Sequence, residues 1–370
     1  MDPGITVIML AKNEETRLRR CMKSLRDHIQ GLVALVDPLS TDRTADVVRE
    51  NGGTVLSVDW PGAFDIARNL CLEHVKTEWV LWIDADEWFE GDDAKHLAEL
   101  TRREEAYCYG LIRQEVDERG PQSRCQVVRM FRSRPYVPFS GVVHEHLDRD
   151  ACADPEALGK EYGTDLSFNH DGYTADVTPA KLARYVELIQ EELRLRPGQI
   201  FYEVKLACTL AAAGDPRADA TLRALGDRLL ELSDELDEAP ISAAEAIGLI
   251  LTAIPESEWR CARTDSLLRL GRAWFPDNPA VLWSVARFEV SRGDLPAAFR
   301  SLQELEALVE SGRYDRRTPH SQAVTGIGLY TNLALVAHQL GRVDVARRNY
   351  ERLLQADPGN AVARQNLLRL

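Results

Sequence analysis

Short apolar runs alternate with amphipathic stretches through the first half of the chain. The apolar runs predict four strands, at residues 5–10, 32–36, 54–58 and 78–83. The stretches between them predict three helices, at residues 15–28, 40–51 and 64–75. In the first of these helices the apolar positions recur at helical spacing, at Leu18, Cys21, Met22 and Leu25. This alternation predicts right-handed crossovers and a mostly parallel, Rossmann-like sheet, which is an α/β fold.

The second half has a different pattern, because almost only helical periodicity follows from about His170 onward. Thr178 is expected to cap a helix with Pro179 at its first position. This helix is expected to run to about Arg196 and to end at Pro197-Gly198.

The C-terminal segment 333–370 predicts a helix, a tight turn at 340–342, a second helix and, after 357–360, a third. Its small and aromatic positions match a tetratricopeptide unit, at Ala334, Ala337, Ala346, Tyr350 and Pro358. Similar turn sequences recur upstream, but their spacing departs from the period of about 34 residues. We therefore predict an all-α domain of degenerate helical repeats over residues 176–370, after an α/β domain over residues 1–175. An irregular helical bundle is the alternative.

Polar clusters follow three of the predicted strands: AKNEE after the first, DPLSTD after the second and DADE after the fourth. Ligands bind at the carboxyl ends of strands in open parallel sheets. In the third cluster, Asp84 and Asp86 lie two residues apart at the end of a buried strand. Such carboxylates suit Mg²⁺ or Mn²⁺, which accept substrate phosphate oxygens as further ligands. Short acidic turns are common, so this motif alone is weak.

The second cluster offers two interpretations. Asp37 ends its strand, where its carboxylate can accept the imide N–H of a pyrimidine base. Ser40 or Thr41 can instead serve as the N-cap of the next helix, and both interpretations can hold together. Lys12, Asn13 and Glu14, at the end of the first strand, are candidates to line the same crevice.

Composition narrows the class of protein. The formal net charge of -14 over 370 residues disfavours nucleic acid as a ligand, because phosphate backbones need clustered Lys and Arg. The seven cysteines form no CxxC pair, which indicates reduced thiols. No apolar run approaches the roughly 20 residues of a membrane span, and the start lacks a signal peptide pattern. We expect a cytoplasmic protein.

Five motifs occur in a fixed order: ITVIMLAKNEE, VDPLSTDRT, AFDIARN, EWVLWIDADE and FSGVVHEHL. Together they resemble the family-two inverting glycosyltransferases of the GT-A fold. The closer resemblance is to the bacterial sublancin-type S-glycosyltransferase subgroup, which carries a C-terminal tetratricopeptide region. The resemblance covers essentially the whole chain. It implies a nucleoside-diphosphate sugar donor, a divalent metal and inversion at the anomeric carbon.

The resemblance also assigns roles by position. It implies that Asp37 contacts the nucleotide base and that Arg68 faces the nucleotide or its diphosphate. It implies that Glu145 is the general base and that His144 is a further metal or diphosphate contact. The remaining donor-binding positions would be Leu10, Lys12, Asn13, Glu14, Asp84, Ala85, Asp86 and Trp88, with Asp84 and Asp86 also holding the metal.

Two departures from the family pattern affect the donor pocket. Pro38-Leu39 replaces a small pair before STD, which leaves the nucleotide open between UDP, the first choice, and GDP or dTDP. Asp65 stands where the family commonly has a small hydroxyl residue, and it adds an acidic group near the cleft.

Strand geometry raises a difficulty for the VHE motif. If residues 144–146 form a regular strand, His144 and His146 face one side and Glu145 the other, so His144 and Glu145 reach one site only if the backbone turns there. His146 is expected to be a structural or rim residue, and His170 a packed core residue. We expect four aromatic residues in the core: Trp79, Trp82, Tyr136 and Phe139. Arg129 and Arg132 either supply local positive charge or lie on an exposed strand.

Three functions compete at this stage. The first is an active glycosyltransferase whose acceptor is a peptide or a small molecule, with the helical region presenting the acceptor or forming a homodimer. The second is an adaptor whose repeats bind a partner and whose N-terminal domain is a degenerate shell. The third is a sugar nucleotidyltransferase, which needs a glycine-rich phosphate loop that AKNEE lacks.

Overall fold

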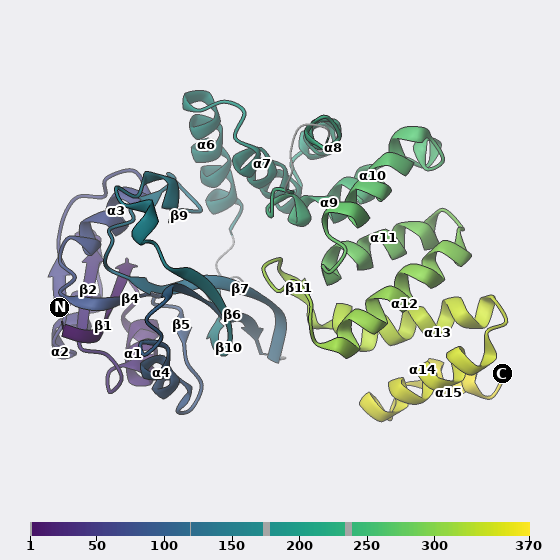
Figure 1. Ribbon diagram of the computed structural model, residues 1–370, viewed down its shortest axis with the longest axis horizontal. Coiled ribbons are helices and arrows are strands. Elements are labelled where there is room, and N and C mark those ends of the chain that lie inside the picture. The colour runs from purple at the N-terminus through teal and green to yellow at the C-terminus, as the bar shows by residue number, and fades with distance from the viewer. Residues whose placement is uncertain (1, 119, 173–177, 234–238) are drawn as a thin grey trace. The chain divides into compact units, whose positions relative to one another are not determined.

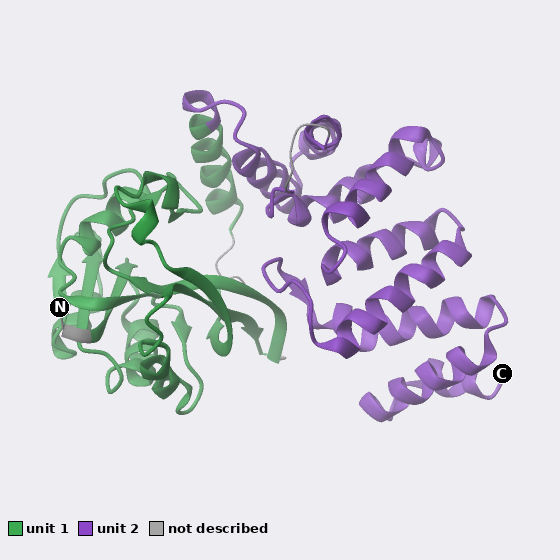
Figure 2. Ribbon diagram, viewed as in Figure 1, with its two compact units in different colours: residues 1–192 green, residues 193–370 purple. Residues whose placement is uncertain are grey.

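The computed structural model describes residues 2–118, 120–172, 178–233 and 239–370 (Figure 1). The chain divides into two compact units, Met1–Glu192 and Leu193–Leu370 (Figure 2). The first unit is built around a sheet and the second from helices, as the change of pattern near His170 predicts.

The sheet of the first unit has the strand order β3-β2-β1-β4-β7-β6-β10-β5. Strands β3, β2, β1 and β4 are mutually parallel, which confirms the mostly parallel sheet expected for this part of the chain. Strand β7 pairs antiparallel with both β4 and β6, and β10 pairs parallel with β6. The strands are β1 (Asp2–Ala11), β2 (Gly31–Val36), β3 (Thr54–Leu56), β4 (Thr77–Trp82), β5 (Glu87–Trp88), β6 (Ala106–Asp117), β7 (Gly120–Arg132) and β10 (Lys160–His170). A separate pair joins β8 (Phe139–Ser140) to β9 (His146–Leu147).

Both faces of the parallel part are covered, which is why its strands are continuous apolar runs. On one face, Val7 and Met9 of β1 share a core with helix α1 (Glu15–Leu25) and helix α2 (Thr44–Glu50). On the other face, Ile8 packs with helix α3 (Phe64–Leu72). The four apolar positions predicted for the first helix are all buried: Leu18, Cys21, Met22 and Leu25.

The helices of this unit are shorter than predicted. Helix α2 begins at Thr44 instead of residue 40, because the carboxylate of Asp42 accepts the Thr44 backbone N–H at 3.0 Å and takes the role expected of Ser40 or Thr41. The short helix α4 (Leu97–Leu100) precedes β6. Helix α6 (Pro179–Leu195) starts as expected, with the Thr178 hydroxyl accepting the Lys181 N–H at 3.2 Å.

The second unit consists mainly of antiparallel helix pairs. Its helices are α7 (Ile200–Ala212), α8 (Ala218–Leu232), α9 (Ala243–Ala253), α10 (Ala262–Trp274), α11 (Pro279–Ser291), α12 (Leu295–Ser311), α13 (Ile327–Gln339), α14 (Val343–Ala356) and α15 (Ala361–Leu367). Successive helices pack on each other, and the pairs α11/α12 and α13/α14 lie side by side in Figure 1. Gly293 and Gly341 adopt positive φ values of 77° and 69° in the turns of these two pairs.

The pair α13/α14 has the packing of a tetratricopeptide hairpin. Ala334, Ala337 and Ala346 are completely buried and let the two helices approach closely around Tyr350. The repeat spacing is irregular because residues 312–326 insert a loop with the two-residue strand β11 (His320–Ser321) between α12 and α13. Among the described residues, no helix is long and apolar enough to span a membrane.

The close approach of α13 and α14 predicts a strong effect of side-chain size at Ala346. Ala346→Leu should destabilise the helical unit by about 1–3 kcal/mol, because the larger side chain overpacks a site that is completely buried. The measurement is guanidinium unfolding followed by circular dichroism at the helical band. The matched control is Arg347→Leu at the adjacent exposed position. Equal midpoints for the two variants would contradict this packing.

Candidate functional site

Three strand ends meet at one edge of the sheet. The register pairs Ala11 at the end of β1 with Val36 at the end of β2, and Ile8 of β1 with Trp82 at the end of β4. The backbone N–H of Asp37 continues the ladder by bonding to the Ala11 carbonyl at 3.0 Å. The polar clusters after these strands therefore lie beside one another, at the edge where open parallel sheets bind ligands.

Asp37 is held as an anion at this edge. Its Oδ2 forms an ion pair with Nζ of Lys12 at 2.8 Å, and its Oδ1 accepts the Leu39 N–H at 2.8 Å. The bond from Lys12 is the main cause that lowers the pKa of Asp37. An ionised carboxylate only accepts hydrogen bonds, which fits it to an N–H group on a base edge.

The remaining residues of the first loop differ in what their side chains do. Leu10 is half-buried against the core of the sheet. Asn13 has a positive φ of 56°, and its Oδ1 accepts the Thr41 N–H at 2.7 Å. Glu14 lies 3.6 Å from Arg17 on the first turn of α1. The side chain of Asn13 thus joins the two loops to each other.

Arg68 connects the acidic motif to the VHE motif. Its guanidinium is 4% exposed, and it bonds through Nη2 to Oδ1 of Asp84 at 2.8 Å and through Nε to Oε1 of Glu145 at 2.5 Å. Burial alone would raise the pKa of Asp84, but the charges of Arg68 and Arg129 outweigh it and hold the pKa at about 2. Both carboxylates are therefore fixed by one buried cation.

Helix α3 is fastened to the segment that carries Glu145. The Asn69 side chain donates to the Phe139 carbonyl at 2.9 Å and accepts the Phe139 N–H at 2.8 Å. Asp65, the departure from the family pattern, accepts the Gly141 N–H at 2.8 Å. These bonds fix the distance between Arg68 and Glu145. Asp65 therefore has a structural role at the edge of the site.

Arg129 is a part of the site for which the sequence left two interpretations. It is buried, not on an exposed strand, and its Nη2 lies 2.6 Å from Oε1 of Glu87 and 3.7 Å from Oδ2 of Asp84. The other oxygen of Glu87 accepts the Asp84 N–H at 2.9 Å. The guanidinium carbons of Arg68 and Arg129 each lie 4.5 Å from the centre of the Trp82 ring. The first carboxylate of the acidic motif is thus held by two cations.

His170 lies beside the second carboxylate of the acidic motif. Its Nε2 is 3.4 Å from Oδ2 of Asp86, and its Nδ1 is 2.5 Å from Oε2 of Glu115. Burial alone would lower the pKa of His170, but the bonds to both carboxylates raise the pKa to about 9. Ala85, between the two aspartates, is 4% exposed and packs into the core.

The backbone after His170 approaches Asp86 closely. A Cβ atom at Gly172 would meet Oδ2 of Asp86 and Nε2 of His170 well inside contact distance. Asp171, between them, pairs with Arg20 at 2.7 Å and Arg17 at 3.5 Å on α1. The absence of a side chain at Gly172 therefore lets the Asp86 carboxylate and the His170 ring lie directly against the backbone.

His170 is not merely the packed core residue that we expected. It is buried, but its ring faces the acidic motif. The sequence held a signal for it, because NHDG is a polar cluster at the end of a strand, of the same kind as DADE. Its partner Glu115 carried no such signal, since the pairing of β6 with β10 brings it there.

The backbone turns at the VHE motif, which resolves the difficulty of alternating faces. His144 has a positive φ of 56°, and strand β9 begins only at His146. The side chain of Glu145 points to Arg68, whereas the ring of His144 lies 5.9 Å from that of Tyr185 on α6. His146 is exposed.

The aromatic residues divide differently from expectation in one case. Trp79 and Phe139 are buried and Trp82 is half-buried, but Tyr136 is 41% exposed, so its assignment to the core is wrong. It lies in the loop between β7 and the two-residue strand β8, outside the layers that pack around the sheet. Trp88 is half-buried, and the guanidinium of Arg20 lies 3.6 Å from the centre of its ring.

Comparison with known proteins identifies the first unit. The family "Glycosyl transferase family 2" matches residues 6–144. The SPbeta prophage-derived glycosyltransferase SunS of Bacillus subtilis is 28% identical over 200 residues, which is 53% of this chain and 46% of that protein. A TPR repeat-containing protein of Synechococcus elongatus is 30% identical over 149 residues, or 40% of this chain and 36% of that one. The chain thus spans less than half the length of these relatives.

Solved structures add similarity at a low level. The chain is similar to TarS of S. aureus, with a TM-score of 0.38 and 15% identity over 84% of this chain and 92% of that one. It is also similar to the mannosyltransferase PcManGT of Pyrobaculum calidifontis, with a TM-score of 0.39 and 15% identity over 73% and 87% of the two chains. These TM-scores are too low to support a conclusion about this chain.

The family match spans strands β1 to β8, which carry the three strand-end clusters and reach the VHE motif. The second unit supplies the tetratricopeptide-like helix pairs. Residues 6–144 therefore form a domain that matches glycosyl transferase family 2, and tetratricopeptide-like helical repeats follow it in the chain.

Proposed function

We propose that the protein is an inverting, metal-dependent glycosyltransferase that takes a sugar from a nucleoside-diphosphate donor. The observation that carries this proposal is the arrangement around the acidic motif: Asp84 bonded to Arg68, and Asp86 beside His170 next to the bare backbone of Gly172. Asp84 and Asp86 follow the carboxyl end of β4 within the family match, and His170 and Gly172 lie beyond the residues that it covers. An adaptor with a degenerate shell would not need to keep the acidic motif, Asp37 and Arg68 together.

The residues present fit a divalent cation only in part. Among the described residues, no three histidine, cysteine, aspartate or glutamate side chains gather as a metal site, so Mg²⁺ or Mn²⁺ would complete its coordination with diphosphate oxygens and water. We assign the protein ligands to Asp86 and His170, where the cation would displace the proton from Nε2 of His170 and Glu115 would orient the ring through Nδ1. His170 replaces His144 in this role, because its ring faces Asp86. When bound, the cation would neutralise charge on the leaving diphosphate.

The residues of the chain supply the rest of the reaction. Asp37, with Lys12, accepts a hydrogen bond from the base, and UDP remains our first choice over GDP or dTDP. Arg68 adds a positive charge beside the diphosphate. Glu145 takes the proton from the acceptor as it attacks on the face opposite the leaving group. Arg68 holds Oε1 of Glu145 and thereby fixes the orientation of the carboxylate.

The acceptor is proposed by class only. The helical unit has the construction of repeat proteins that bind peptides, so a peptide acceptor is one candidate and a small molecule another. The same helices also offer a surface for a homodimer. Sedimentation of the purified protein tests the dimer directly, and a monomer at micromolar concentration would exclude it.

The first test is calorimetric titration of UDP, GDP and dTDP with and without Mn²⁺. We expect one nucleotide to bind, and its binding to weaken at least about tenfold without the metal or in Asp86→Ala, because hard cations depend on carboxylate oxygens. Asp92→Ala, at an exposed position after β5, is the matched control and should bind as the wild type does. Absence of binding by well-folded wild type would contradict the proposal.

The close approach of Asp86 and His170 to the backbone of Gly172 makes a second prediction. Gly172→Ala places a methyl group where the Asp86 carboxylate and the His170 ring now lie, so one of them must move. We expect the loss of Mn²⁺-dependent nucleotide binding, with metal-independent binding retained. Gly271→Ala in helix α10 serves as the control for the glycine change, since a Cβ at Gly271 meets its nearest atoms at 3.4 Å, an ordinary van der Waals distance. Retained Mn²⁺ dependence in Gly172→Ala would remove Asp86 and His170 as the ligands.

The third prediction concerns the proton acceptor. Glu145→Gln keeps an oxygen for the Arg68 Nε–H but cannot take a proton, so release of nucleoside diphosphate from the donor to water should fall about 100-fold or more. Nucleotide affinity should stay within about twofold. The same change at exposed Glu156 is the control. A rate in Glu145→Gln equal to that of the control would exclude Glu145 as the base.

A further inference from the structure

The two loops that follow β1 and β2 are fastened to each other by side chains. The N–H of Asn13 donates to the Ser40 hydroxyl at 3.3 Å, and the N–H of Thr41 donates to Oδ1 of Asn13 at 2.7 Å. Deeper in the structure, the N–H of Glu14 donates to Oγ1 of Thr44 at 2.8 Å. These bonds join residues that are 27 to 30 positions apart in the sequence.

The helices that start after these loops cap each other. Oδ2 of Asp42 accepts the N–H of Glu15, the first residue of α1, at 2.9 Å. In return, Oε2 of Glu15 accepts the N–H of Arg43, which precedes α2, at 3.2 Å. The first N–H groups of a helix have no partner inside it, so each loop supplies the partners that the other helix needs.

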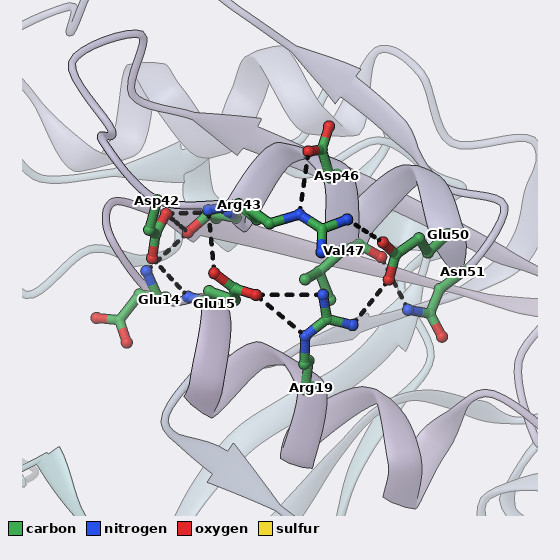
Figure 3. A network of polar contacts seen from close by, with 10 residues as sticks. Glu14, Glu15, Arg19, Asp42, Arg43, Asp46, Val47, Glu50 and Asn51 are labelled. Atoms are coloured by element: carbon green, nitrogen blue, oxygen red, sulfur yellow. Dashed lines mark hydrogen bonds and ion pairs between the residues drawn. The ribbon is translucent and has the colours of Figure 1, made fainter.

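A second layer of charges lies outside these caps (Figure 3). Arg19 of α1 bridges Glu15 at 3.2 Å and Glu50 of α2 at 2.7 Å, and Arg43 reaches Glu50 at 2.9 Å. These side chains are substantially exposed, so water and salt weaken their attraction. The inner bonds are different, because Thr44 is completely buried and Asn13 holds a left-handed backbone conformation.

We infer that Thr44 and Asp42 are positioning residues for the donor nucleotide. This inference rests on the proposed function, in which both loops contact the nucleotide: Asp37 from one and Lys12 from the other. Neither Thr44 nor Asp42 needs to touch the nucleotide. They set the distance between the two loops, so that Lys12 and Asp37 meet in one geometry before the donor arrives.

The inference predicts a separation of binding from turnover. The acidic motif follows β4 and Glu145 precedes β9, so neither depends on the bonds between the first two loops. Loosening these bonds should therefore weaken nucleotide binding and leave the rate at saturating donor unchanged. A residue that only stabilised the fold would lower the melting temperature without this separation.

The test compares three variants with the wild type. Thr44→Val keeps the shape of the buried side chain but removes the acceptor for the Glu14 N–H, whereas Thr44→Ser keeps that acceptor. Arg19→Ala removes only the outer charge bridge. Each variant is measured for affinity toward the nucleotide that binds the wild type, for nucleoside diphosphate release at saturating donor, and for its melting temperature.

We expect Thr44→Val to bind the nucleotide at least about tenfold more weakly, with release at saturating donor within about twofold of the wild type. Thr44→Ser and Arg19→Ala should bind as the wild type does. If Thr44→Val fails to fold, Asp42→Asn at an exposed position carries the test, because its amide keeps only one oxygen for the two backbone N–H groups of Glu15 and Thr44. It should show the same separation.

Two results would overturn the inference, and they are distinguishable. Equal affinity in wild type and in the folded Thr44→Val or Asp42→Asn variant, with the nucleotide bound by both, rejects the positioning role and leaves the proposed function intact. Absence of nucleotide binding by the wild type rejects the proposed function itself, and the inference with it.

Discussion

The buried guanidinium of Arg68 is the constraint on which the site depends. A buried cation needs anionic partners, and here Asp84 and Glu145 supply them from two segments far apart in the chain. Helix α3 places the cation, β4 places the first carboxylate, and the bonds from Asn69 to Phe139 place the second. Because loss of either carboxylate would leave the buried charge less compensated, the fold and the geometry of the site are coupled.

The sequence was sufficient for the parallel half of the sheet. Strands buried on both faces are continuous apolar runs, and amphipathic helices alternate with them along the chain. This alternation is typical of a parallel sheet with crossover helices. The sequence alone therefore places the polar clusters after β1, β2 and β4 at one edge of the sheet. The hairpin of α13 and α14 was equally predictable, because the small side chains of Ala334, Ala337 and Ala346 allow two helices to pack closely.

The partners within the site could not be predicted in the same way. Arg129 and Glu115 lie on the hairpin of β7 and β6, and this hairpin reaches the site through pairings between distant segments, of β7 with β4 and of β6 with β10. The place of His170 follows from the parallel pairing of β10 with β6. The turn at His144 depends on one left-handed residue, which neighbouring letters in the sequence do not specify. The exposure of Tyr136 could not be predicted for a related reason, since a loop has no hydrophobic periodicity that indicates which side chains are buried.

Among the described residues, Asn13 and His144 are the two non-glycine residues with positive φ, and they lie in the loop after β1 and in the turn before Glu145. Side chains, not glycines, thus define the backbone at both places. Glycine would allow these turns many conformations in solution, whereas bulkier residues with fixed partners allow few. Much of the conformational entropy of these two turns is consequently lost when the chain folds, and less remains to be lost when a ligand binds. In the proposed site, these two turns would therefore be ordered before a ligand binds, and selectivity would depend more on shape than on adaptation.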